Sequence, residues 1–202
     1  MSRLGDLPFD FEHGTCGTFM IHEIPKIFLC FPNREFRKCR SLSKHKNDLW
    51  SHGFDFETKF SFETMRNTIY RHQHSKIANY RGFPLVLGSW MDPIDGVKLE
   101  MFDTTKSEWF PKNDYPFSPT GTYCHYSVVS LATSVLYFGG SFWNPGSYDV
   151  DIVAEFRNDK WKKHGYMSQP RSCHRSIDMN NKIFIFGGYS SRFLDKRLKF
   201  AN

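Results

Sequence analysis

Two cysteine–histidine pairs are the residues of this sequence whose types could most readily do chemistry. Cys124 is followed by His125, and Cys173 is followed by His174. Thiolate and imidazole groups together bind zinc or copper. No third or fourth ligand accompanies either pair at a suitable spacing in the sequence. We therefore predict no metal site and no metal cofactor.

The familiar catalytic signatures are also missing from the sequence. It contains no Gly-x-Ser-x-Gly, no phosphate-binding loop and no His-Glu-x-x-His. Two pairs of acids, Asp92 with Asp95 and Asp149 with Asp151, lie where turns or strand edges are expected, and solvated carboxylates are the ordinary outcome there. We therefore predict no catalytic residue and no cofactor, and expect that the protein is not an enzyme.

Both cysteine–histidine pairs occupy the same place in an internal repeat. Three segments begin with His, pass a short polar turn and end in an apolar strand stopped by Gly. Their first residues, His74, His125 and His174, are spaced 51 and 49 residues apart. The segments are HSKIANYRGFPLVLGSW (residues 74–90), HYSVVSLATSVLYFGGSF (residues 125–142) and HRSIDMNNKIFIFGGYS (residues 174–190).

A second half follows two of these segments and ends on a tryptophan. VKLEMFDTTKSEWF contains Trp109, and VDIVAEFRNDKWKK contains Trp161. In each, a strand ends at an aromatic residue, a polar turn reverses the chain, and the next strand opens on an aromatic residue. Each unit therefore predicts four short strands. The 21 phenylalanines agree with an all-β fold, because aromatic residues favour pleated, half-buried surfaces.

A period near 50 residues, four strands, a Gly-Gly pair and a spaced Trp resemble the kelch repeat of β-propellers. The resemblance implies an all-β, kelch-like propeller segment of four-stranded antiparallel blades, incomplete or open, with three to four repeats. The glycines allow positive φ and a close approach of inner strands, and each Trp fills a wedge between blades. The structural repeat positions are His74, Gly88, Trp109, His125, Gly139, Gly140, Trp161, His174, Gly187 and Gly188.

The predicted organisation divides the chain into five parts. Residues 1–18 form an N-terminal segment, residues 19–70 a degenerate blade with Phe31-Pro32 in place of Gly-Gly, residues 71–120 and 121–170 two blades, and residues 171–202 an incomplete blade with a C-terminal tail. Propellers close with four to eight blades. The chain is therefore a fragment of a longer propeller or an open arc, and an open arc exposes strand edges that invite self-association or completion by further blades.

The loops between the second and third strands are the predicted partner-binding surface. In a four-stranded antiparallel blade they share a face with the connection from the fourth strand to the next blade. They carry aromatic residues beside Pro and Gly, and Trp, Tyr and Arg are enriched at binding hot spots. The candidate residues are Trp90, Met91, Asp92, Phe142, Trp143, Asn144, Tyr189 and Arg192. The alternative is that Trp90 and Trp143 fold back onto the sheets.

The leading interpretation is a non-catalytic protein–protein interaction module, or scaffold, that binds a protein partner through its loops. The alternatives are a truncated oxidase-type or carbohydrate-binding propeller, and a non-functional fragment of a longer gene. We expect no nucleic-acid partner, since the net charge of +6 is modest, and no membrane association, since no apolar run is long enough. Five cysteines without a C-x-x-C spacing predict reduced thiols, and the lack of a signal peptide predicts a cytoplasmic location.

Overall fold

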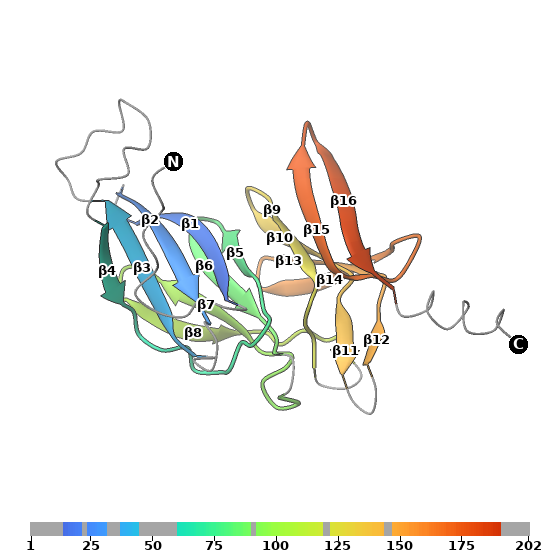
Figure 1. The fold of residues 1–202 in the computed structure, drawn as a ribbon, viewed down its shortest axis with the longest axis horizontal. Helices are drawn as coiled ribbons and strands as arrows, with labels where there is room; N and C mark the ends of the chain where they lie inside the picture. The colour runs from blue at the N-terminus through green and yellow to red at the C-terminus, as the bar shows by residue number, and fades with distance from the viewer. Residues whose placement is uncertain are drawn as a thin grey trace, which may run out of the picture.

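A computed structural model describes residues 14–21, 24–31, 37–44, 60–89, 92–118, 122–143 and 147–190 of the chain. Every regular element in these ranges is a β-strand (Figure 1). The predicted all-β fold is therefore confirmed. Three of the sheets have four antiparallel strands each, as expected for propeller blades.

Each four-stranded sheet is an antiparallel meander whose own strands pair in the order in which they occur along the chain. The first contains β1 (Thr15–Ile21), β2 (Ile24–Cys30), β3 (Cys39–Lys44) and β4 (Phe60–Thr64). The second contains β5 (Ile77–Tyr80), β6 (Phe83–Leu87), β7 (Leu99–Asp103) and β8 (Glu108–Lys112). The third contains β9 (Ser127–Ser130), β10 (Ser134–Phe138), β13 (Ile152–Arg157) and β14 (Lys160–Tyr166).

Two further hairpins complete the described strands. The connection between β10 and β13 forms β11 (Ser141–Trp143) and β12 (Ser147–Asp149). The chain then forms β15 (Ser172–Met179) and β16 (Lys182–Tyr189), which pair only with each other in the described residues. The first sheet begins at Thr15, so the predicted boundary between residues 1–18 and 19–70 falls inside β1.

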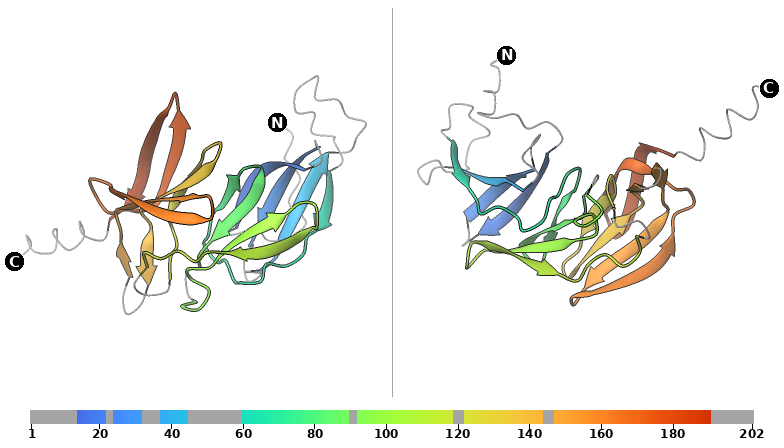
Figure 2. Two further views of the ribbon diagram at one scale, coloured as in Figure 1. Left: turned by 180° about the vertical axis from the view of Figure 1, so that it is seen from behind. Right: turned by 90° about the horizontal axis from the view of Figure 1, so that it is seen from below.

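The first strand of each sheet lies beside the first strand of the next, and the sheets fan out from these inner strands (Figures 1 and 2). Cross-sheet hydrogen bonds hold this arrangement. The Ile77 amide of β5 donates to Thr15 Oγ1 of β1 at 3.2 Å, and the Asn79 amide donates to Ser130 Oγ of β9 at 2.8 Å. The inner ends of the sheets are therefore fixed relative to one another.

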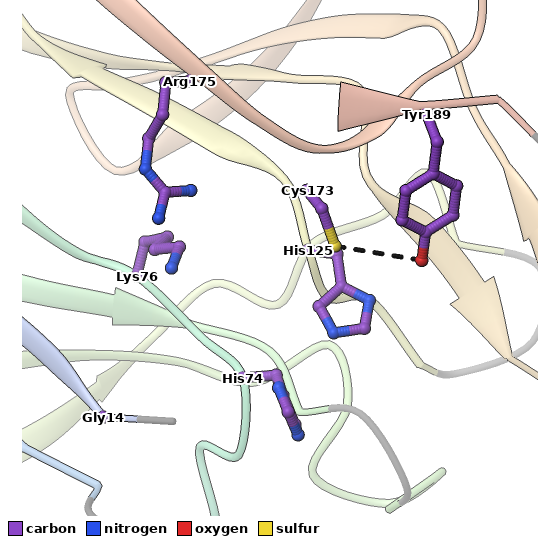
Figure 3. Close-up of a pocket in the computed structure, with 7 residues that line it drawn as sticks. All are labelled: Gly14, His74, Lys76, His125, Cys173, Arg175 and Tyr189. Carbon is purple, nitrogen blue, oxygen red and sulfur yellow. Dashed lines mark hydrogen bonds between the residues drawn. The ribbon is translucent and has the colours of Figure 1, made fainter. Parts of the chain in front are cut away.

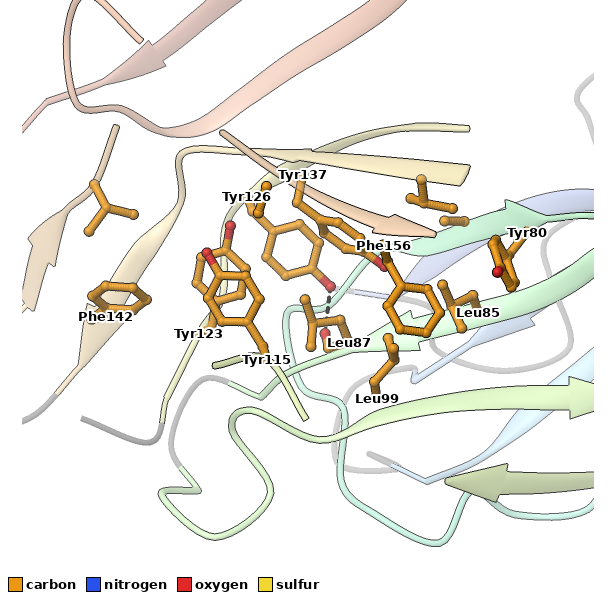
Figure 4. Packing of buried hydrophobic residues seen from close by; sticks show 14 residues of the cluster. Tyr80, Leu85, Leu87, Leu99, Tyr115, Tyr123, Tyr126, Tyr137, Phe142 and Phe156 are labelled. Carbon is orange, nitrogen blue, oxygen red and sulfur yellow. Dashed lines mark hydrogen bonds between the residues drawn. The ribbon is translucent and has the colours of Figure 1, made fainter. Parts of the chain in front are cut away.

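The cores lie between adjacent sheets and are mainly aromatic. Between the second and third sheets, Tyr115 and Tyr123 stack with ring centroids 4.3 Å apart, and Tyr126 stacks on Tyr123 at 4.8 Å (Figure 4). Between the first and second sheets, Phe28 of β2 packs edge-on against Phe102 of β7 at 5.7 Å. Each sheet buries its face only against its neighbour, as the repeat predicts.

The two repeat tryptophans occupy equivalent wedges between sheets. The Trp109 indole donates from Nε1 to the carbonyl of Arg66, after β4, at 3.1 Å. The Trp161 indole donates to the carbonyl of Asn113, after β8, at 2.8 Å. In both cases the tryptophan of one sheet hydrogen-bonds to the segment that leaves the preceding sheet. Each indole therefore ties its own sheet to the preceding one.

The glycine pair after β10 lies where two backbones come close together. Gly139 and Gly140 have φ of 56° and 98°. A Cβ on Gly139 would lie 2.5 Å from the carbonyl oxygen of Arg171, and one on Gly140 would lie 2.7 Å from that of Cys124. Side chains do not fit at such distances, and this is the reason for glycine that the repeat predicts.

The prediction that the cysteines are reduced is wrong for one pair. Cys30 at the end of β2 and Cys39 at the start of β3 form a disulfide, with Cα atoms 4.0 Å apart. The two residues are direct cross-strand partners in the register of β2 and β3. The strand register therefore brings together two thiols whose spacing in the sequence does not predict a disulfide. Cys16, Cys124 and Cys173 are free thiols.

Candidate binding site at the starts of the inner strands

Three residues at the starts of inner strands share an unusual backbone conformation. His74, His125 and Cys173 have φ of 58°, 54° and 55°, which non-glycine residues seldom adopt. The His74 and His125 rings meet edge to face with centroids 5.0 Å apart. The Cys173 amide donates to the His125 carbonyl at 2.9 Å, so consecutive blades are joined at this position.

This geometry corrects the predicted alignment of the last repeat by one residue. Cys173, and not His174, takes the place that His74 and His125 take in the earlier units. The sequence agrees once the glycines are used as the reference. Gly88, Gly139 and Gly187 follow His74, His125 and Cys173 by 14 residues each. His174, which the sequence alone aligns with His74 and His125, is therefore the residue next to the repeat position.

His174 points into the protein instead. Its side chain is 1% exposed, and burial lowers the pKa of its imidazole to about 4, with the Arg171 guanidinium adding to the effect. The ring is therefore neutral near pH 7. A neutral buried imidazole of this kind contributes to packing beside the Gly139 backbone and is not a ligand exposed to a partner.

A cavity of about 460 Å³ opens among these strand starts (Figure 3). All four inner strands, or the residues just before them, contribute to its wall. The lining residues are Gly14, His74, Lys76, His125, Cys173, Arg175 and Tyr189. The volume lies in the range of roughly 300–1,000 Å³ that is typical of ligand sites.

The cavity is basic. Lys76 and Arg175 lie two residues after His74 and Cys173, so both follow the repeat position by the same step along an inner strand. Burial lowers the pKa of the Lys76 ammonium, and the Arg175 guanidinium lowers it further. None of the described residues that line the cavity carries a carboxylate. An anionic group placed here would therefore relieve the repulsion between two cations.

The two thiols near the cavity differ in their surroundings, since Cys124 is buried and Cys173 is exposed. Burial raises the pKa of the Cys124 thiol to about 12, which keeps it protonated near neutral pH. The Cys173 thiol donates to Tyr189 Oη at 3.8 Å. Across the described ranges, no group of three or more His, Cys, Asp or Glu side chains is placed to hold a metal ion. The chemical feature of this arrangement is a recess whose wall carries two cations.

Of the predicted partner-binding residues, Tyr189 lines the cavity and is 56% exposed. Asp92 shapes its own loop, because Oδ1 accepts the amide of Ile94 at 3.0 Å. The prediction that Phe142 contacts a partner is wrong, because its ring is 2% exposed and packs against Tyr123 with centroids 5.5 Å apart. The other predicted residues lie outside the described residues or have undescribed side chains: Trp90, Met91, Asn144, Arg192 and the side chain of Trp143.

Sequence reasoning missed the two cations of the cavity. Lys76 and Arg175 look like ordinary solvated charges at the start of strands. With His174 aligned to His125, Arg175 falls one position away from the equivalent of Lys76. The constant spacing of 14 residues to the glycines is the signal that would have brought them into register.

The fold and the site together define a set of kelch-like propeller blades around a basic cavity. The chain has distant, partial homology to Kelch domain-containing protein 10 of Xenopus laevis, with 27% identity over 124 residues. The Xenopus tropicalis protein of the same name also matches with 27% identity. Each match covers 56% of this chain and 30% of the relative. No protein-family model matches the chain.

This homology confirms the kelch resemblance that the repeat suggested. The four-stranded antiparallel sheets are what kelch blades require. In the described part of the chain, no helix is long and apolar enough to cross a membrane.

Proposed function

We propose that this chain is a non-catalytic protein-interaction module that receives an acidic segment of a partner protein in the cavity. The observation that carries the proposal is the pair of cations in the cavity wall, Lys76 just before β5 and Arg175 on β15. Burial and, after it, repulsion from the Arg175 guanidinium lower the pKa of Lys76, and no described residue that lines the cavity supplies a carboxylate to balance the two cations. A carboxylate between them would regain that energy as charge-assisted hydrogen bonds.

The size and position of the cavity support a peptide segment as its occupant. Its volume of about 460 Å³ has room for more than one side chain. Tyr189 lines the same cavity, lies next to Cys173 (Figure 3) and exposes 56% of its surface, so it offers an aromatic contact of the kind found at binding hot spots. The loop that follows β6 and the hairpin of β11 and β12 lie at the same end of the molecule (Figure 1).

The proposal of a binding role, and not a catalytic one, rests on the chemistry of the nearby groups. The buried Cys124 thiol is a poor nucleophile because its pKa is raised to about 12. His174 is held neutral away from solvent. A fixed positive site without an activated nucleophile suits recognition of negative charge.

A fluorescence anisotropy titration with a labelled glutamate-rich peptide tests the proposal. The comparison peptide has glutamine in place of each glutamate and is otherwise identical. We expect the glutamate peptide to bind and the glutamine peptide to bind at least about tenfold more weakly, since charge-assisted hydrogen bonds are worth roughly 1.5–3 kcal/mol each. Affinity should fall as pH rises, because deprotonation of Lys76 removes one of the two cations, and its pKa is already lowered by burial.

Variants locate the binding. Lys76→Gln and Arg175→Gln should each weaken the glutamate peptide, whereas Lys106→Gln, in the exposed turn between β7 and β8, should not. Equal binding of the two peptides, or equal effects of all three variants, would contradict the proposal. Stoichiometric copper with turnover of an alcohol would favour the oxidase-type alternative instead.

A further inference from the structure

The last hairpin has half the strands of the other sheets. The first three sheets have four strands each, whereas β15 pairs with β16 and, within the described residues, the far edge of β16 has no partner strand. Figure 1 shows this hairpin projecting beyond the third sheet. An unpaired edge presents a row of backbone donors and acceptors that can template another strand.

This hairpin also holds much of the exposed apolar surface of the described chain. Phe184 and Phe186 of β16 are 44% and 55% exposed, and Ile183 is 37% exposed. Other exposed apolar side chains of the hairpin are Ile177, Met179 and Tyr189. Contiguous exposed apolar side chains on a strand edge mark an interaction surface.

The turn of the hairpin tells which backbone groups of β16 face outward. Asn180 and Asn181 both have positive φ, at 53° and 58°, which makes a two-residue turn of type I′. The turn joins the cross-strand partners Met179 and Lys182. The backbone N–H and C=O groups of Lys182 point toward β15, because the pair that closes a two-residue turn is hydrogen-bonded. Hydrogen-bonded and non-hydrogen-bonded pairs alternate along an antiparallel ladder, so the backbone groups of Ile183 and of every second residue after it point away from β15.

We propose that the free edge of β16 pairs antiparallel with β16 of a second copy of this chain, around a two-fold axis at Ile185. The result is a four-stranded sheet in the order β15, β16, β16, β15, which has the strand number of the other blades. Phe184 then lies opposite Phe186 of the second copy, and Lys182 lies opposite Gly188 of the second copy. This inference concerns a different surface from the cavity and goes beyond the proposed function.

The charge pattern of β16 favours a second copy as the occupant. The stretch IFIFGGY, residues 183–189, has no charged side chain, so two copies meet along it without like charges face to face. Elsewhere the chain is basic, with a net charge of +6, and opposes closer contact between other surfaces. An isologous two-fold contact of this kind closes on itself and does not propagate into fibres.

The exposed aromatic area sets an upper limit on what these side chains contribute to such a contact. With roughly 200 Å² per aromatic side chain, the exposed parts of Phe184, Phe186 and Tyr189 in two copies total on the order of 600 Å². The paired backbones and Ile183 add to this area. Specific interfaces bury from about 1,200 Å², so a dimer of moderate affinity is expected.

Sedimentation velocity over a range of concentrations tests the proposal on the whole chain. We expect a reversible monomer–dimer equilibrium. Ile183→Lys should weaken the dimer at least about tenfold, because the new ammonium lies opposite Gly187 of the second copy and loses water there without an anionic partner. The hairpin itself should survive, since residue 183 lies opposite Asp178 of β15 and the new pair is of opposite charge. Ile94→Lys is the matched control, because Ile94 is 75% exposed in the loop between β6 and β7.

A cysteine trap tests the register directly. In Ile185→Cys the two introduced thiols meet across the axis as a hydrogen-bonded pair, with Cα atoms about 5.5 Å apart, which suits a disulfide. We expect a covalent dimer under mild oxidation, and none from Ile177→Cys on β15. A monomer at all concentrations would overturn the proposal. So would a dimer that Ile183→Lys and Ile94→Lys affect equally, or a lower melting temperature in Ile183→Lys without a change of mass.

Discussion

Replacing His174 with glutamine should remove much of the acid sensitivity of the fold. The imidazole is 1% exposed, and burial lowers its pKa from 6.5 to about 4. The unfolded chain therefore takes up a proton on this side chain as pH falls through 6.5, while the folded chain does not until pH falls to about 4. The free energy of unfolding falls across that interval. Glutamine has a similar size and stays neutral at every pH.

The two pKa values set the magnitude. At about pH 5 the proton bound by the unfolded state destabilises the fold by about 2 kcal/mol, and by about pH 4 the loss approaches 3 kcal/mol. Carboxylates also titrate in this range, but they do so in the parent chain and in His174→Gln alike. The difference between the two proteins therefore isolates the contribution of His174.

Urea unfolding at about pH 7 and about pH 5, followed by tryptophan fluorescence, measures that difference. We expect the parent chain to lose about 2 kcal/mol more than His174→Gln between the two pH values. Near pH 7 both proteins should unfold cooperatively, since the native site already holds a neutral ring. If both lose the same free energy, the imidazole is not held neutral by burial, and the reasoning is refuted.

Two further predictions concern backbone geometry and the disulfide. Gly139→Ala should destabilise the chain by more than about 2 kcal/mol in urea unfolding, because φ is 56° and a Cβ would meet a carbonyl oxygen. Gly82→Ala is the control: φ is also positive there but the space is open, so the loss should be only about 1 kcal/mol. Equal losses in the two variants would refute the close approach at Gly139. The Cys30–Cys39 disulfide closes a loop with a sequence separation of 9, so its reduction should lower the free energy of unfolding by roughly 2–3 kcal/mol. Rapid alkylation of both thiols in the native chain without reductant would show that the disulfide does not form.

The four-stranded unit could be predicted because local chemistry repeats it. Polar turns and aromatic strand ends mark the strands, and Trp161 with Gly139 marks the places where neighbouring sheets touch. These residues act through their own size and backbone freedom, so their roles are visible in the sequence.

The cavity and the disulfide depend on register, which the sequence carries only weakly. Cys173 and His174 are adjacent in the sequence. A shift of one residue in the alignment of the last repeat therefore decides whether Arg175 is equivalent to Lys76 and faces the same cavity. The first sheet lacks the glycine pair, so nothing in its sequence aligns Cys30 with Cys39. Phe142 was predicted to contact a partner because it lies in the loop between the second and third strands of its blade, but that loop folds into a hairpin and the Phe142 ring is buried.

Protection of Cys173 against alkylation tests the central claim most directly, because this free, exposed thiol lies in the cavity wall. The rate of its modification by iodoacetamide is followed by mass spectrometry, with the glutamate-rich peptide, with its glutamine counterpart and with neither. We predict that the glutamate peptide lowers the modification rate in proportion to the fraction of chain left unbound, which is a several-fold slowing near saturation, and that the glutamine peptide does not. A glutamate peptide that binds the chain and leaves the rate unchanged would show that acidic partners bind elsewhere.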